Sequence, residues 1–123
     1  MRTVLGVAVA GALGALLRWG ISAWFGRRFP GFPWGTLVIN VTGSFLLGFL
    51  FVVLTERTTT SPAVRVSLTT GLMGAYTTFS TFSLETIRLV EDGAVGAAAA
   101  NVAASLLLGL AGMWLGISMG RIT

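Results

Sequence analysis

Long apolar runs separated by short polar clusters dominate the sequence. They define four apolar segments, at about residues 3–25, 34–55, 63–90 and 93–120. Each reaches the roughly 20 residues that a helix needs to cross a hydrocarbon core about 30 Å thick. The connections contain Gly and Pro at 27–33, polar residues ending in Ser61-Pro62, and Glu91-Asp92, all typical of turns and helix starts. The pattern predicts an all-α membrane protein with four transmembrane helices in a single domain, residues 1–123.

Composition supports this interpretation and excludes several classes of function. Hydrophobic residues make up 54% of the chain and charged residues 10%, which leaves too little polar surface for a soluble globule. Cysteine and histidine are absent, so disulfides, zinc sites and imidazole bases are excluded. The arginines that produce the net charge of +4 are spread along the chain rather than clustered. We therefore expect neither an enzyme nor a nucleic-acid-binding protein.

The first apolar segment admits two interpretations. It follows Met1-Arg2 and is rich in small residues, as in a secretory signal. However, Gly6, Ala10 and Gly14 recur every four residues, a spacing that allows close helix packing. Gly112, Gly116 and Gly120 repeat this spacing in the last segment. We interpret the first segment as a retained helix and both glycine series as packing positions.

The arginines specify no single orientation in the membrane. If the four segments alternate, Arg2, Arg57, Arg65 and Arg121 lie toward one side, and Arg18, Arg27, Arg28 and Arg88 lie toward the other. An excess of basic residues normally marks the cytoplasmic side, and here there is none. Either other features set the topology, or the chain inserts both ways round. Insertion both ways would permit an antiparallel two-fold dimer.

The third apolar segment is unusually polar for a helix that faces lipid. Its middle contains Thr69, Thr70, Gly71, Gly74, Thr77, Thr78, Ser80, Thr81 and Ser83. Glycine and β-branched threonine weaken a helix, and a break at membrane depth is tolerated only where it is buried or lines a cavity. We predict a break near Gly74–Thr78, whose free backbone groups could meet an ion. The alternative is that the hydroxyls only join helices together.

Two further patterns flank this predicted break. Phe79 and Phe82 share a helix face, and they either pack or turn their positive ring edges toward a small anion. In the second segment, Thr36, Asn40 and Ser44 form a polar stripe. The Asn40 amide could donate to an anion, or it could form an interhelical hydrogen bond.

Three motifs resemble those of the CrcB/Fluc fluoride channel family in order and spacing. They are Gly14-Ala15-Leu16-Leu17-Arg18, then Gly35-Thr36-Leu37-Val38-Ile39-Asn40-Val41-Thr42-Gly43-Ser44-Phe45, and Gly71 followed by Thr77-Thr78-Phe79-Ser80-Thr81-Phe82-Ser83 with Glu85. The resemblance implies a fluoride-selective channel for passive export from the cytoplasm across a bacterial or archaeal plasma membrane. It also implies an antiparallel, dual-topology homodimer with two pores.

The same resemblance assigns roles to individual residues. The fluoride pathway would comprise Asn40, Phe79, Phe82, Ser80, Thr81, Glu85, Ser105 and Arg18. A structural sodium ion at the dimer interface would be held by the backbone carbonyls of Gly74 and Thr77. The fourth segment departs from the family pattern, because Asn101 stands where a tyrosine often occurs and Gly109 and Met113 stand where hydroxyls can occur. Asn101 could supply a donor, or it could cap or pack near the helix start.

Other interpretations remain open from the sequence. Glu85 could pair with Arg88 rather than face a pore, and Arg18 could extend its charge to the interface. A proton-coupled small multidrug transporter would also form an antiparallel four-helix dimer. It needs a membrane-embedded acid, which the first segment lacks. A non-transporting membrane assembly subunit is the third possibility.

Overall fold

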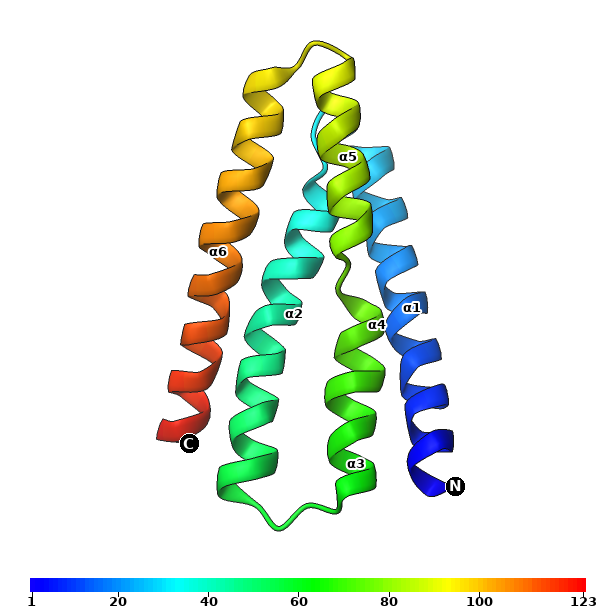
Figure 1. The fold of residues 1–123 in the computed structure, drawn as a ribbon, viewed down its shortest axis with the longest axis vertical. Coiled ribbons are helices and arrows are strands. Elements are labelled where there is room, and N and C mark those ends of the chain that lie inside the picture. The colour runs from blue at the N-terminus through cyan, green and yellow to red at the C-terminus, as the bar shows by residue number, and fades with distance from the viewer.

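The computed structural model describes residues 1–123, and every regular element in it is a helix. Helix α1 (Arg2–Arg28) is followed by α2 (Trp34–Val52), which continues as the π-helical turn η1 (Val53–Arg57). The third segment contains α3 (Pro62–Val66), the π-helical η2 (Ser67–Met73), α4 (Gly74–Tyr76) and α5 (Phe79–Glu91), and α6 (Val95–Ile122) ends the chain. The helices run side by side along the long axis, with both termini at the same end (Figure 1).

Three of these helices are long and apolar enough to cross a membrane. They are Arg2–Arg28, Trp34–Arg57 and Val95–Ile122, with mean hydropathies of 1.8, 2.4 and 1.8. The third predicted segment is instead divided, and its second part, α5, has only 13 residues. The all-helical, membrane-spanning character predicted from the sequence is confirmed.

The third segment is interrupted at Thr77 and Thr78, inside the range predicted to break. Thr77 has φ −81° and ψ 158°, and Thr78 has φ −151° and ψ 120°, so both residues are extended rather than helical. The Thr78 hydroxyl accepts a hydrogen bond from the Thr81 N–H at 3.1 Å. Thr78 thus acts as the N-cap that starts α5.

Glycines bring the helices into backbone contact, as their spacing predicted. A Cβ at Gly14 would clash with the backbone of α4 and η2, at Leu72 and Tyr76. On α6, the buried glycines Gly112, Gly116 and Gly120 all lie against α2. Small residues allow such close approach because no side chain separates the two backbones.

We expect Gly116→Ala to destabilise the fold by about 1–3 kcal/mol through overpacking. The new Cβ would collide with the carbonyl of Phe45 and lie 2.9 Å from the Phe49 nitrogen, and these are backbone atoms that cannot swing away. Gly96→Ala is the matched control in the same helix, because nothing lies within 4 Å of its Cβ position. Because Gly96 lies in the first turn of α6, that variant should keep the stability of the wild type or gain less than about 0.5 kcal/mol. Unfolding in detergent measures both, and equal stability of the two variants would contradict the packing argument.

Candidate functional site

An open groove of about 650 Å³ lies where α2, the break, α5 and α6 meet. Four residues predicted to form the pathway line it, namely Asn40, Phe79, Phe82 and Ser105. The other lining residues are Gly43, Ser44, Leu47, Thr77, Thr78, Ser83, Thr86, Ile87, Val102 and Leu106. None of the lining residues is charged, so the groove combines apolar surface with hydroxyl and amide groups.

Asn40 holds the break in place through a reciprocal pair of hydrogen bonds. Its Nδ2 donates to the Thr78 carbonyl at 2.8 Å, and its Oδ1 accepts from the Thr78 N–H at 2.8 Å. Thr78 is 7% exposed, so these backbone groups need partners inside the protein. The interhelical bond considered for Asn40 is therefore present. An amide nitrogen carries two hydrogens, which leaves one N–H of this groove-lining residue for a ligand.

Phe79 and Phe82 form an aromatic pair at the start of α5. Their ring centroids are 5.6 Å apart and the ring planes are inclined by 47°. Phe79 is 79% exposed, whereas Phe82 is half-buried. The Phe79 ring therefore fills no space in the interior of its own chain, and packing within the subunit does not account for a phenylalanine at this position.

Asn101 is buried behind the groove and connects α6 to α5. It is 1% exposed. Its Nδ2 donates to the Thr86 hydroxyl at 2.9 Å, and its Oδ1 accepts from the Ser105 hydroxyl at 3.4 Å. Asn101 is thus neither a cap nor a groove-lining group, but it orients two hydroxyls that line the groove. Thr86 was missed from the sequence, although its position one turn after Phe82 places it on the same face of α5.

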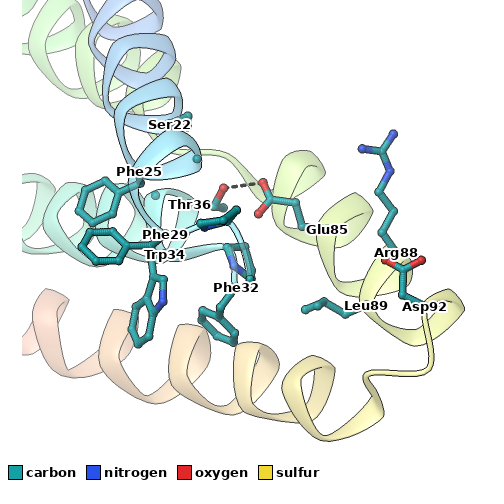
Figure 2. Close-up of a pocket in the computed structure, with 15 residues that line it drawn as sticks. Ser22, Phe25, Phe29, Phe32, Trp34, Thr36, Glu85, Arg88, Leu89 and Asp92 are labelled. Carbon is teal, nitrogen blue, oxygen red and sulfur yellow. Dashed lines mark hydrogen bonds between the residues drawn. The ribbon is translucent and has the colours of Figure 1, made fainter.

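Glu85 lies in a second pocket, outside the groove. This pocket of about 310 Å³ is formed by the end of α1, the following loop, the start of α2 and the end of α5. Figure 2 shows the Glu85 carboxylate turned toward Thr36, whose hydroxyl donates to it at 2.6 Å. Arg88 points away from Glu85 in the same view, and the single ion pair in the chain joins Glu56 and Arg121. The Glu85–Arg88 pairing considered from the sequence is absent.

The remaining predicted pathway residues also lie off the groove. Ser80 and Thr81 surround the Thr78 cap, with hydroxyl oxygens at 3.4 Å and 3.1 Å from the Thr78 hydroxyl. Arg18 is half-buried on α1 and lines neither pocket. Gly74 is exposed, with no heavy atom within 4 Å of its Cβ position.

At the break, two backbone carbonyls lose the hydrogen bonds that they would accept in a continuous helix. In an uninterrupted helix, the Gly74 carbonyl would accept from the Thr78 N–H, and the Thr77 carbonyl would accept from the Thr81 N–H. Here the Thr78 N–H donates to Asn40 Oδ1 and the Thr81 N–H donates to the Thr78 hydroxyl. The backbone oxygens at Gly74 and Thr77 are thus left with capacity to accept.

Comparison with known proteins gives a consistent result. The family model described as "CrcB-like protein, Camphor Resistance (CrcB)" matches residues 5–117. Relatives named fluoride-specific ion channel FluC are 49% identical in Geobacter metallireducens and 46% in Geobacter sulfurreducens, each over 98% of both chains. Another, from Acidobacterium capsulatum, is 47% identical over 95% of this chain and 94% of its own length. The resemblance found in the motifs is confirmed, and the chain belongs to the CrcB family.

Proposed function

We propose that this protein is a subunit of a fluoride-selective channel that lets fluoride leave the cytoplasm passively. Family membership supports the proposal, and the relatives are named as ion channels rather than as enzymes. The observation that carries it within the chain is the uncharged groove of donors and phenyl rings. A multidrug transporter would need an acid in this position to exchange protons, and the groove contains none.

Such a groove suits the permeation of a small, strongly hydrated anion. Removing water from fluoride is prohibitive unless the path supplies replacement donors. The free N–H of Asn40 is one such donor, and the rings of Phe79 and Phe82 offer positive edges. The absence of a fixed positive charge keeps binding weak enough for release, which conduction requires. The sequence contains no Walker motif for nucleotide binding, so we expect the ion to move down its gradient without any step that consumes nucleotide.

The complete pore would be formed by two chains in an antiparallel homodimer. Each chain would cross the plasma membrane four times, with the interrupted α3–α5 segment as its third crossing. Three observations support an assembly of this kind: the groove is open, the Phe79 ring is 79% exposed, and arginines are balanced between the two ends. A second subunit would cover these surfaces and, by symmetry, create a second pore.

A structural sodium ion at the dimer interface fits the same break. The carbonyls of Gly74 and Thr77 have capacity to accept, and Gly74 faces open space. Carbonyl oxygens are suitable ligands for a hard cation. A sodium ion coordinated by one such pair of carbonyls from each subunit would join the subunits without any acidic side chain.

We expect sodium removal to lower the stability of the dimer, because an ion that binds only the assembled state stabilises it by mass action. The measurement is thermal unfolding in detergent with sodium replaced by N-methylglucamine. Returning sodium should restore the unfolding temperature. An unfolding temperature that does not depend on sodium would contradict the proposed site.

Fluoride efflux from liposomes that contain only this protein tests the central proposal. A fluoride-selective electrode should record rapid efflux once the potassium ionophore valinomycin relieves the membrane potential. Well-folded dimers that release no fluoride would refute a channel and favour a non-transporting assembly subunit. Proton release on addition of a cationic drug would instead favour the transporter class.

We expect cysteine labels at either terminus to be reached from both sides of the membrane. The chain has no natural cysteine, so a single introduced cysteine reports one position without background. Dual topology requires equal labelling from inside and outside the cell. The measurement compares labelling by a membrane-impermeant maleimide in intact cells and in opened cells. Labelling from one side alone would mean that a differently oriented partner completes the dimer.

A further inference from the structure

Most hydroxyls on the groove cannot donate to an ion, because their hydrogens are already engaged. Thr77, Ser83 and Thr86 donate to the backbone carbonyl four residues earlier, at 3.0, 2.9 and 2.7 Å. A serine or threonine hydroxyl has a single hydrogen. Counting hydroxyls therefore overstates the number of donors that an anion would meet in the groove.

Ser44 differs from these three residues. It lines the groove one helical turn after Asn40, and its hydroxyl makes no hydrogen bond within the chain. No buried polar side-chain atom lacks a partner in this structure, so the Ser44 oxygen is accessible from the groove. A hydroxyl that takes the place of a water molecule around an anion needs both a hydrogen without a partner and access to the groove.

The facing surface of α6 leaves space for this hydroxyl. Opposite Ser44 stands Gly109, and a Cβ there would find the Ser44 oxygen as its nearest heavy atom, at 3.9 Å. Because glycine presents no side chain, α6 supplies no polar group of its own at this level. The Ser44 hydroxyl is therefore the polar group at the level of the groove where α6 contributes only Gly109.

Ser105 marks the adjacent level on α6, one turn before Gly109. Its hydroxyl points to Asn101 Oδ1 across 3.4 Å, a long distance for an O–H donor. This hydrogen is only weakly held. Together, Asn40, Ser44 and Ser105 provide the donors of the groove that are free or easily released.

We propose that Ser44 is an anion-contacting residue of the pathway, whose O–H donates directly to dehydrated fluoride beyond Asn40. This inference rests on the proposed channel function and adds a contact that the motifs did not assign. The hydroxyl replaces one water of the ion's hydration shell at the level where α6 carries only Gly109. Hydrogen bonds to charged groups are stronger than neutral ones, so loss of this contact is expected to be measurable.

The test compares fluoride efflux from liposomes at equal amounts of folded dimer. Ser44→Ala should reduce the flux by about tenfold or more, the change that corresponds to one charge-assisted hydrogen bond. Ser118→Ala is the matched control, because it removes a serine hydroxyl whose hydrogen is already given to the Trp114 carbonyl and which lies outside the groove. Its flux should stay within about twofold of the wild type.

Three results would decide the question. Wild-type flux in Ser44→Ala, or an equal fall in both alanine variants, would overturn the assignment. If Ser44→Ala does not assemble, Ser44→Cys replaces it in the test, because a thiol has a similar shape but is a weak hydrogen-bond donor. A reduced flux in Ser44→Cys supports the contact, and an unchanged flux contradicts it. Absence of fluoride efflux in the wild type would refute the channel function itself, which separates the two failures.

Discussion

Asn40→Leu is expected to reduce fluoride flux by about a hundredfold or more and to lower the stability of the protein. Leucine leaves the Thr78 N–H and carbonyl without the partners that they have at 2.8 Å. Each buried backbone group left unpaired costs about 1–3 kcal/mol. The groove also loses the remaining Asn40 N–H, and about 2.7 kcal/mol of barrier already corresponds to a hundredfold in rate. Efflux and detergent unfolding measure the two effects.

Two further variants separate the structural and the permeation roles of Asn40. Asn40→Asp keeps an acceptor for the Thr78 N–H but has no amide hydrogen for the anion, and it adds a negative charge. Asn40→Asp should assemble better than Asn40→Leu, but its fluoride flux should be no higher than that of Asn40→Leu. Thr42→Val is the control, because it loses an α2 hydroxyl that contacts the Tyr76 hydroxyl at 2.9 Å and lines no part of the groove. Wild-type flux in Asn40→Asp would contradict a donor role for this amide.

The positions of the helices along the chain could be predicted, because the thickness of the membrane sets the length of the apolar runs in the sequence. Apolar runs of bilayer length and turn residues between them fix where helices begin and end, to within about three residues. The break was predictable for the same reason, since Gly74 and the threonines that follow it make a continuous lipid-facing helix unfavourable. These features depend on local chemistry, which the sequence displays directly.

The partners of the break could not be predicted, because they depend on the register between helices. Asn40 and Thr78 are separated by 38 positions, and no periodic pattern says which residue of α2 lies beside which residue of the third segment. Asn101 shows the same limit. Its burial and its two bonds to Thr86 and Ser105 follow from how α6 packs on α5, which glycine spacing predicts only as close contact.

The polar stripe on α2 shows how one pattern separates into two environments. Thr36, Asn40 and Ser44 occur at equal spacing, and from the sequence they form one surface. In the fold, Thr36 donates to Glu85 in the second pocket, whereas Asn40 and Ser44 face the groove. Helical periodicity identifies the face, but only the neighbouring helices decide what each residue on it meets.

Replacing Phe79 or Phe82 with isoleucine is expected to lower fluoride flux by at least about tenfold while the dimer still forms. Isoleucine keeps most of the apolar volume, so stability should fall by less than about 1.5 kcal/mol. It has no quadrupole, and therefore offers no positive edge to a desolvated anion. The tenfold change corresponds to about 1.4 kcal/mol per ring. Efflux per folded dimer is the measurement.

Phe51→Ile provides the matched control for this change. Phe51 is 52% exposed and lies on α2 outside the groove, so it undergoes the same loss of a ring without bordering the path. Its flux should equal that of the wild type. Because Phe79 is 79% exposed within the chain, a fall in its flux cannot come from a collapsed core of the subunit. If Phe79→Ile and Phe82→Ile both conduct as fast as Phe51→Ile, the ring edges do not stabilise the ion. The amide and hydroxyl donors would then have to supply the whole replacement for water.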